Sequence, residues 1–290
     1  MIINPISYPG NKAKLIKQIV PLIPEEESVF VDVFAGSGIV GVNSSKKKII
    51  ANDISIEAIN LLKYFYLTDS DNVIKVVEKI IEQYNLTYSR KKPKGFYVEF
   101  KHEGLSKYNK EGFENLKKDY NDNPSIEKLF VLLIYGFNHY IRFNSKGQFN
   151  VPVGKVDFSS SIYSNTINFV DKIKTLDMQF LNYDFRNQNL YKYDNAVYYF
   201  DPPYLITKAP YNAFWKEKDE LDLLNILDEL NNRGKKFMLS NVLLSNGKEN
   251  KILKEWAQKY NVVYMKRQYL NANYRKKNIT NTIEILVKNF

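Results

Sequence analysis

Hydrophobic residues gather in short continuous runs along the chain, and amphipathic or polar segments separate these runs. Between Ala196 and Phe200, five apolar or aromatic residues follow one another before the sequence changes to Asp-Pro-Pro. Runs of this kind are typical of strands that are buried on both faces of a parallel sheet. We predict strands at 28–34, 48–52, 178–181, 196–200, 236–241, 261–265 and 283–287.

Segments with helical spacing lie before or between several of these runs. The apolar residues between Leu15 and Val20 share one face of a predicted helix. Further helices are expected at 219–233, with Gly234 ending the helix, and at 249–260. No crossover helix precedes the last predicted strand, so we expect it to be antiparallel to its neighbour. The alternation predicts an α/β fold with a doubly wound, mostly parallel sheet.

The alternation stops in the middle of the chain. Between 89 and 118, nine Lys or Arg stand against four Glu, with aromatic residues among them. This composition suits a nucleic-acid surface or a solvated face over a small core. We expect helices at 57–65, 72–84 and 125–135. We therefore predict a domain formed by 1–60 and 167–290, interrupted by a mainly helical insertion at 61–166.

One part of the predicted insertion, residues 136–158, has a distinct pattern. Asn144-Ser145-Lys146-Gly147 is a turn signal between two arms with β-forming residues, which predicts a hairpin or a hairpin-like loop. From 136 to 156 the segment contains Arg142, Lys146 and Lys155 but no acidic residue. A basic hairpin with amide and aromatic side chains is suited to the major groove of DNA, where arginine pairs with guanine.

A glycine-rich turn follows the first predicted strand. The sequence Gly36-Ser37-Gly38-Ile39-Val40-Gly41 matches G-x-G-x-x-G between a strand and a helix, the context that a nucleotide-binding turn requires. The second strand is followed by Asp53, seventeen residues after Gly36, where an acid can accept hydrogen bonds from ribose hydroxyls. These features predict a site for a nucleoside cofactor, and both NAD and S-adenosylmethionine fit them.

The run that ends at Phe200 leads into Asp201-Pro202-Pro203-Tyr204. Open α/β sheets bind ligands at the carboxyl ends of their strands, where Asp201 is expected. The two prolines remove two N–H donors and leave carbonyl groups that only accept hydrogen bonds. Acid, carbonyl and tyrosine ring together suit a planar group that carries an NH2. A strand followed by a proline-rich turn with a capping aspartate is the alternative interpretation.

Composition narrows the classes of function. The 42 basic and 32 acidic residues give a net charge of +10, which fits polyanion binding but also the Lys-rich composition of AT-rich genomes. Cysteine is absent and there are two histidines, so we expect no disulfide, cysteine nucleophile or metal site. We also expect no membrane span and no secretion signal, and a cytoplasmic location.

The motifs taken together resemble the DNA adenine-N6 methyltransferases of the D12 class, which include the GATC-methylating Dam type. The resemblance runs through SYPGNK, DVFAGSG, NDIS, RFN…FNVPVGK, NYDF, DPPY and SN to the last predicted strand, and so covers nearly the whole chain. It implies a Rossmann-like, S-adenosylmethionine-dependent catalytic sheet with an inserted DNA-recognition domain. It also implies site-specific methylation of adenine N6 in double-stranded DNA by base flipping and direct in-line attack.

The resemblance also implies roles for individual residues. Asp201, Pro202, Pro203 and Tyr204 match the catalytic tetrapeptide. The residues that match the cofactor site are Tyr8, Lys12, Asp32, Phe34, Gly36, Gly38, Asp53, Asp184, Phe185 and Asp201. The residues expected to bind DNA are Asn138, Arg142, Asn144, Lys146, Pro152 and Lys155.

Two positions depart from the Dam type. Ser7 stands where that type has a lysine that touches the first guanine, and Tyr140 replaces an aliphatic residue that helps to read the thymine. GATC is nevertheless the leading candidate for the target sequence. In the implied mechanism Tyr204 stacks on the flipped adenine, and Tyr211, Phe214 and Trp215 are candidates to close over it.

Three other classes of protein share parts of this pattern. An amino-methyltransferase acting on RNA or on another base would keep the DPPY and cofactor motifs. An NAD-dependent oxidoreductase would share the glycine-rich turn but would not need DPPY. A non-catalytic DNA-binding protein derived from a methyltransferase would normally have lost Asp201 or the glycines, and both are present.

Overall fold

The computed structural model describes residues 1–6, 10–93, 95–97, 104–207, 214–266 and 282–290. The chain divides into two compact units. The first comprises Met1–Asn11, Gly36–Val42 and Ser55–Met178, and the second comprises Lys12–Ala35, Asn43–Ile54 and Gln179–Phe290. The domain boundaries expected from the sequence, with residues 61–166 as an insertion, stay a prediction.

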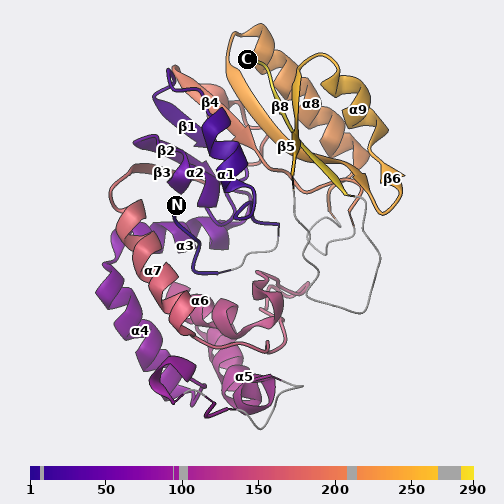
Figure 1. The fold of residues 1–290 in the computed structure, drawn as a ribbon. Coiled ribbons are helices and arrows are strands. Elements are labelled where there is room, and N and C mark those ends of the chain that lie inside the picture. The colour runs from indigo at the N-terminus through magenta and orange to yellow at the C-terminus, as the bar shows by residue number, and fades with distance from the viewer. Residues whose placement is uncertain (7–9, 94, 98–103, 208–213, 267–281) are drawn as a thin grey trace. The chain divides into compact units, whose positions relative to one another are not determined.

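A central sheet forms the frame of the second unit (Figure 1). Across the described residues its eight strands include the path β3-β2-β1-β4-β5-β8-β7, with β6 paired to β5. Their bounds are β1 Val29–Asp32, β2 Lys48–Asn52, β3 Asp177–Leu181, β4 Ala196–Phe200, β5 Lys236–Ser245, β6 Lys248–Glu249, β7 Asn261–Met265 and β8 Ile283–Lys288. Each predicted strand is present, and β6 was not predicted.

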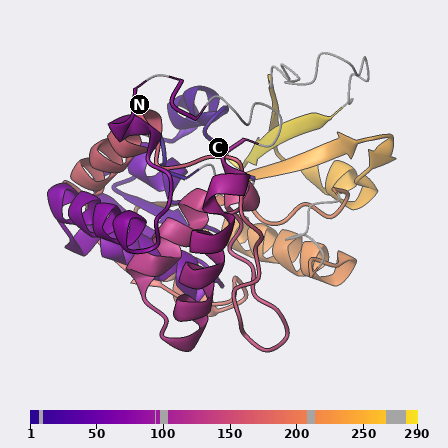
Figure 2. The same cartoon turned by 90° about the horizontal axis from the view of Figure 1, so that it is seen from below.

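Strand directions confirm a mostly parallel sheet. Strand β1 runs parallel to both β2 and β4, and β4 runs parallel to β5. Strand β8 is antiparallel to β5, beside which it lies in Figure 2, and also to β7, as predicted for the last strand. The chain builds outward from β1 to β2 and β3 on one side and from β4 to β5 on the other. The topological switch point therefore lies between β1 and β4, where doubly wound sheets bind their ligands.

Burial explains why the runs form central strands. All five residues of β4 and all four of β1 are buried. Side chains alternate between the two faces of a sheet. On one face, Val31, Tyr198, Leu239 and Ile285 pack into a core with apolar residues of helices α8 (Glu217–Asn232) and α9 (Lys251–Ala257). On the opposite face, the ring of Phe30 stacks on that of Tyr199, with the centroids 5.9 Å apart.

Helices flank the strands of this unit. Helix α8 begins with a capping box, in which the Lys216 amide donates to Asp219, and ends before Gly234, whose φ of 67° suits glycine. The predicted end at Gly234 is confirmed. The short helices are α1 Ile16–Ile19, α2 Ile39–Asn43, α9 Lys251–Ala257 and the 3-10 turns η1 Val20–Leu22 and η5 Gln188–Tyr191, while α8 spans Glu217–Asn232.

The first unit is mainly helical. Its helices are α3 Ile56–Leu67, α4 Ser70–Gln83, α5 Ser106–Asp122, α6 Ile126–Tyr135 and α7 Ser160–Ile173, with 3-10 turns η2 Ser89–Lys91 and η4 Phe137–His139. Side chains of Ser55, Ser125 and Ser159 cap the amino ends of α3, α6 and α7. The predicted helices at 57–65, 72–84 and 125–135 are present as α3, α4 and α6. Helices α5 and α7 were not predicted.

The segment predicted as a hairpin, residues 136–158, forms a loop with two isolated antiparallel bridges, Gly136 to Val153 and Phe143 to Phe149. No continuous strand occurs in this part of the described chain. One reason is that Asn121 of α5 holds the outward-facing backbone polar groups of Phe149, so no further strand can pair on that side. A second reason is that Pro152 has no N–H to donate. The tip is still a turn, because Gly147 donates to the carbonyl of Asn144 with φ at 74°.

Two classes of feature do not occur in the part of the chain that the structure describes. None of its helices combines the length and the apolar character that crossing a membrane requires. No group of three or more His, Asp or Glu side chains that could hold a metal ion is found among these residues either.

Candidate active site

Polar side chains gather on one face of the sheet in the second unit. Asp32 ends β1, Asp201 directly follows β4, and Glu284 is the second residue of β8. By alternation, Asp201 shares the face of Tyr199, opposite to the face that packs on α8 and α9. Tyr199 itself hydrogen-bonds Ser240 of β5 at 2.8 Å. The carboxyl ends of β1 and β4 therefore carry two carboxylates at the switch point.

Lys12 joins this group from a turn before α1. Its side chain is 3% exposed, and its ammonium donates hydrogen bonds of 2.5 Å to both Asp201 Oδ1 and Tyr204 Oη. The Lys12 carbonyl accepts from the amides of Leu15 and Ile16, so the first turn of the helical segment fixes its backbone. Because Asp201 and Lys12 are 189 residues apart, the fold and not local sequence brings them together.

Tyr204 and Glu284 complete the cluster. The Tyr204 hydroxyl lies 3.0 Å from Asp201 Oδ1 and 3.3 Å from Glu284 Oε1, and it can donate its one proton to either carboxylate. Glu284 Oε1 also lies 3.7 Å from the ammonium of Lys12. This ammonium is 5.0 Å from the centroid of the Tyr204 ring. The Lys12 ammonium thus lies near the carboxylates of both Asp201 and Glu284. We call these four residues (Lys12, Asp201, Tyr204 and Glu284) the Lys12 cluster.

Burial governs the electrostatics of these groups. It raises the pKa of the Asp201 carboxyl, the neighbouring Glu284 adds to this rise, and the charge and hydrogen bond of Lys12 oppose it. Burial and the charge of Asp201 hold the pKa of Tyr204 well above its usual value near 10. Tyr204 is therefore a neutral hydroxyl at physiological pH and acts as a hydrogen-bond donor.

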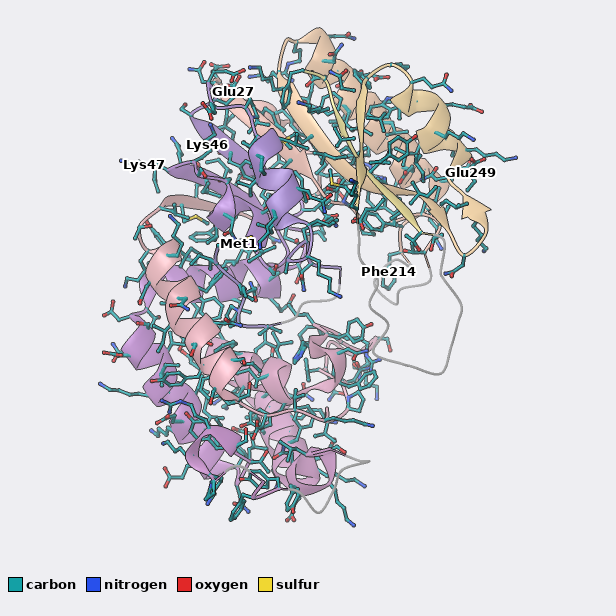
Figure 3. The ribbon with its side chains drawn as sticks, in the orientation of Figure 1. Met1, Glu27, Lys46, Lys47, Phe214 and Glu249 are labelled. Carbon is teal, nitrogen blue, oxygen red and sulfur yellow. The ribbon has the colours of Figure 1, made fainter. Side chains whose placement is uncertain are left out.

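An aromatic cluster lies after the ends of β1 and β3. Trp215 meets Phe185 and Phe34 with ring centroids 5.3 and 5.9 Å apart, and Phe34 meets Phe185 at 5.5 Å. The indole N–H of Trp215 donates to buried Glu220 at 2.7 Å, which anchors the ring. Its neighbour Phe214 is 87% exposed (Figure 3). Of the aromatic residues proposed to close over a base, Trp215 is thus fixed in this cluster, while Tyr211 lies outside the described residues.

Asn52 ties the loop after β3 to the central strands. Its side-chain amide donates to the carbonyls of Val33 and Tyr183, and its oxygen accepts from the Tyr183 amide. Phe185, two residues further on, is buried, while Asp184 is exposed and pairs with Arg186 at 3.2 Å. The neighbouring Asp53 is half-buried after β2. This network holds Asp184 and Phe185 at the carboxyl end of β3 and Asp53 at the carboxyl end of β2. All three residues were predicted to belong to the cofactor site.

The glycine-rich turn belongs to the first unit. Gly36 and Gly38 have φ of 48° and 69°, which side chains rarely adopt. A Cβ at Gly38 would also come within 2.9 Å of the Leu62 side chain in α3. Glycine is therefore favoured at position 38 by its backbone conformation, since the end of the Leu62 side chain could shift to make space.

The predicted DNA-binding residues lie in the 136–158 segment of the first unit. Arg142 is exposed, and Asn150 holds one edge of its guanidinium, since Nε donates to Asn150 Oδ1 at 2.8 Å and Nη2 to the Asn150 carbonyl at 2.7 Å. Asn144 stabilises the tip through hydrogen bonds from the amides of Lys146 and Gln148. Lys146 at the tip is exposed.

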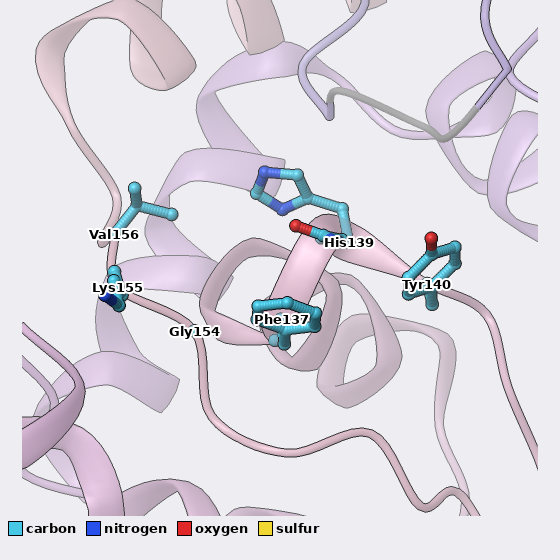
Figure 4. Close-up of a pocket in the computed structure, with 8 residues that line it drawn as sticks. Phe137, His139, Tyr140, Gly154, Lys155 and Val156 are labelled. Atoms are coloured by element: carbon cyan, nitrogen blue, oxygen red, sulfur yellow. The ribbon is translucent and has the colours of Figure 1, made fainter. Parts of the chain in front are cut away.

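A pocket of about 430 Å³ lies in the same segment (Figure 4). Asn138 and His139, in its wall, have φ of 52° and 55°, an uncommon conformation for two successive non-glycine residues. The ring of His139 is fixed by a 2.7 Å contact from Nδ1 to the Leu133 carbonyl. Phe137, Tyr140, Gly154, Lys155 and Val156 also line the pocket.

The structure thus brings Lys12, Asp201 and Tyr204 into direct contact, with Asp32 on the same sheet face. Ser7 and Tyr8 lie outside the described residues, as do residues 267–281. Glu284 and Glu220 were not identified from the sequence. The sequence feature that could have identified them is an acidic residue within an apolar strand or helix face. Such a residue is rarely buried without a partner.

Comparison with known proteins places this arrangement in a family context. The family model described as D12 class N6 adenine-specific DNA methyltransferase matches residues 8–271. Type II methyltransferase M.FokI of Planomicrobium okeanokoites is 36% identical over 99% of this chain and 43% of its own length. Modification methylase StsI of Streptococcus sanguinis is 35% identical, again over 99% of this chain and 43% of its own length.

A shorter relative matches along most of its length. The DNA adenine methylase of Escherichia coli (strain K12) is 25% identical over 94% of this chain and 91% of its own length. The chain therefore spans nearly all of this relative but less than half of M.FokI and of StsI. Since the family model covers most of the sequence, including the strands that carry Asp32 and Asp201, the chain belongs to the D12 class of N6 adenine-specific DNA methyltransferases.

Proposed function

We propose that this protein transfers a methyl group from S-adenosylmethionine to N6 of an adenine in double-stranded DNA. The observation that carries the proposal is the buried Lys12 cluster at the carboxyl end of β4, beside the switch point of the sheet. The four successive residues from Asp201 to Tyr204 supply a carboxylate acceptor, two proline carbonyl groups and a tyrosine ring.

The residues of β4 and its following turn suit the chemistry of an exocyclic amine. The side chain of Asp201 and the carbonyl of Pro202 accept the two N6 hydrogens, and the prolines offer no competing N–H. These two bonds draw the nitrogen lone pair away from the ring and orient it for in-line attack. S-adenosylmethionine, when bound, would supply the methyl group from its sulfonium and leave as the thioether S-adenosylhomocysteine, while the amine would lose one N6 proton to solvent. Positioning and electrostatic stabilisation provide the rate enhancement, and no covalent bond to the protein is needed.

The residues after the strands fit the proposed methyl donor. Asp32 at the end of β1 and Asp201 after β4 supply carboxylates near a sulfonium charge, while Phe34 and Phe185 supply aromatic faces for a purine. Asp53, after β2, would accept from the ribose hydroxyls. We assign Tyr8, Lys12, Gly36, Gly38 and Asp184 to the same cofactor site on the resemblance of their motifs.

The target adenine must leave the duplex before it can reach Asp201. Base flipping costs a few kcal/mol, which stacking and hydrogen bonds in the enzyme pocket offset. We assign the stacking role to Tyr204, whose ring is held by hydrogen bonds of its hydroxyl in the Lys12 cluster.

We assign sequence recognition to the 136–158 segment. Asn150 occupies the Nε edge of the Arg142 guanidinium, so the Nη1 and Nη2 ends are directed to the guanine acceptors O6 and N7. Pro152 is assigned to the thymine methyl, and GATC is the first target to test. We assign Asn138, Asn144, Lys146 and Lys155 to further DNA contacts.

The test of this function is expression in a host without adenine methylation, followed by mapping of N6-methyladenine by sequence context. We expect methylated adenines in one short sequence. Purified protein with labelled S-adenosylmethionine should transfer label to duplex DNA and not to RNA of the same sequence. Label in RNA alone would instead support an RNA amino-methyltransferase, and the absence of transfer to either would contradict the proposal.

Arg142→Ala should relax sequence discrimination at one guanine by about 1–3 kcal/mol, because the bidentate contact to that base is lost. The measurement is kcat/KM on duplexes that carry each of the four bases at that position. Lys146→Ala is the matched control, since loss of an exposed cation at the loop tip should weaken all duplexes uniformly and reduce the salt dependence. Unchanged base preference in the Arg142 variant would contradict the assignment.

A further inference from the structure

Glu284 is a buried acid in an otherwise apolar strand. It is 3% exposed, and the three residues that follow it in β8, Ile285, Leu286 and Val287, have no exposed surface. It pairs with Val242 of β5 and Met265 of β7, so the strand backbone is fixed on both sides. A buried carboxylate is costly unless it is paired and hydrogen-bonded. Among the groups it reaches are the Tyr204 hydroxyl at 3.3 Å and the Lys12 ammonium at 3.7 Å.

The proposed chemistry makes competing demands on Asp201. Its carboxylate must accept a hydrogen from the target amine, yet Oδ1 already accepts from Lys12 at 2.5 Å and lies 3.0 Å from the Tyr204 hydroxyl. Both donors lie at Oδ1, which leaves Oδ2 to accept from the amine as long as Lys12 and Tyr204 stay on the Oδ1 side. A second carboxylate within reach of both donors holds them on that side.

We propose that Glu284 is a positioning residue, which holds the Lys12 ammonium and the Tyr204 hydroxyl beside Asp201 so that the Asp201 carboxylate keeps an oxygen for the target amine. Glu284 acts through Lys12 and Tyr204 and does not touch the DNA. This role rests on the proposed methyl transfer, because it is defined by what Asp201 must accept.

The charge balance of the Lys12 cluster gives this role a distinctive signature. With Lys12 present, one cation neutralises part of the repulsion between Asp201 and Glu284. Without it, the repulsion between these two buried carboxylates rises, which favours protonation of one of them. Removal of the Glu284 charge should then be harmful when Lys12 is present and helpful when Lys12 is absent. A residue that only filled space would show losses of the same sign in both backgrounds.

The experiment is a double-mutant cycle with Lys12→Met and Glu284→Gln, and Lys288→Gln as a control for loss of a charge elsewhere on β8. We expect Glu284→Gln to lower kcat on the order of 10- to 100-fold, the range seen when partners that orient reacting groups are lost, with little change in KM. Lys288→Gln should match the wild type. The double variant should be more active than Lys12→Met alone.

Two further readouts separate positioning from packing. In thermal unfolding without ligand, Lys12→Met should lower Tm and Glu284→Gln in that background should restore part of the loss. Glu284→Asp, which keeps the charge, should retain more kcat than Glu284→Gln. Wild-type kcat in Glu284→Gln, additive losses in the cycle, or equal losses in the Gln and Asp variants would each overturn the role of Glu284 alone. A wild-type protein that forms no N6-methyladenine would overturn the proposed function and this role with it.

Discussion

Asp201→Asn is expected to lower the rate of methyl transfer by a factor of about 10³, the upper end of the loss seen when one hydrogen-bonding group that stabilises the transition state is removed. The two side chains have the same shape, but the amide has one acceptor oxygen. Lys12 and Tyr204 are both donors at Oδ1 and would keep that oxygen facing them. The amide NH2 would then face the target amine, donor against donor. The measurement is a single-turnover assay with labelled methyl donor and a duplex that contains the target sequence.

Asp194→Asn is the matched control for this variant. The Asp194 side chain is 91% exposed and pairs with Lys235 at the surface, so its loss should leave the rate unchanged. Calorimetric binding of S-adenosylhomocysteine to the Asp201→Asn variant should remain detectable, which separates loss of chemistry from loss of folding. A rate close to that of the wild type would contradict the acceptor role of Asp201.

The central strands of the sheet could be predicted because nearly all their residues are apolar or aromatic. Strands β1 and β4 are buried throughout, and the sequence at each is a continuous apolar run. The antiparallel direction of β8 was predicted from connectivity alone, since the sequence predicts no crossover helix before this strand. Strand order depends on contacts between distant segments, and the doubly wound prediction came from the alternation of elements.

Helix α5 was not predicted from the sequence. Its buried residues Asn109, Phe113, Leu116 and Tyr120 follow helical spacing. The surrounding Lys-rich composition indicated a nucleic-acid surface or a solvated face over a small core, and no helix was predicted there. Buried Asn109 is polar and weakens the apolar stripe, but it bonds the Thr87 amide and hydroxyl, so tertiary contacts support this face. The stripe was present in the sequence, whereas the partner that satisfies Asn109 could not be inferred from spacing.

The sequence predicted which motifs form the site but not which side chains contact one another. Tyr204 and Asp201 are neighbours in the chain, but Glu284 lies 80 residues beyond Tyr204, and the fold alone brings the two together. The hypothesis that Trp215 closes over a flipped base was based on its residue type, because its partner Glu220 was not identified from the sequence. The hydrogen bond to Glu220 and the contacts with Phe34 and Phe185 hold Trp215 in the aromatic cluster, and its closing over a base stays a prediction. The sequence shows which residue types are present, but the role of a side chain depends on partners that are distant in the sequence.

Glu220→Gln is expected to lower the free energy of unfolding by about 3 kcal/mol, although the two side chains have the same size. Glu220 is fully buried and accepts from Trp215, Asn241 and Asn250 at 2.7, 3.1 and 2.9 Å. Burial raises the pKa of Glu220, and these hydrogen bonds oppose the rise. Neither asparagine can turn over to present an acceptor, because its oxygen already accepts a backbone N–H, that of Val242 or of Leu253. All three partners are therefore donors, and the site requires a group that only accepts.

The NH2 of glutamine would meet at least one of these donors, leaving buried hydrogen-bonding groups without partners. Urea unfolding measures the expected loss, and Glu229→Gln, an exposed position of the same helix α8, should leave stability unchanged. Because the Trp215 indole depends on Glu220, the variant should also show altered tryptophan fluorescence and weaker binding of S-adenosylhomocysteine. Stability equal to that of the wild type would mean that the donors around Glu220 can rearrange, and the anchoring of Trp215 by this carboxylate would then be wrong.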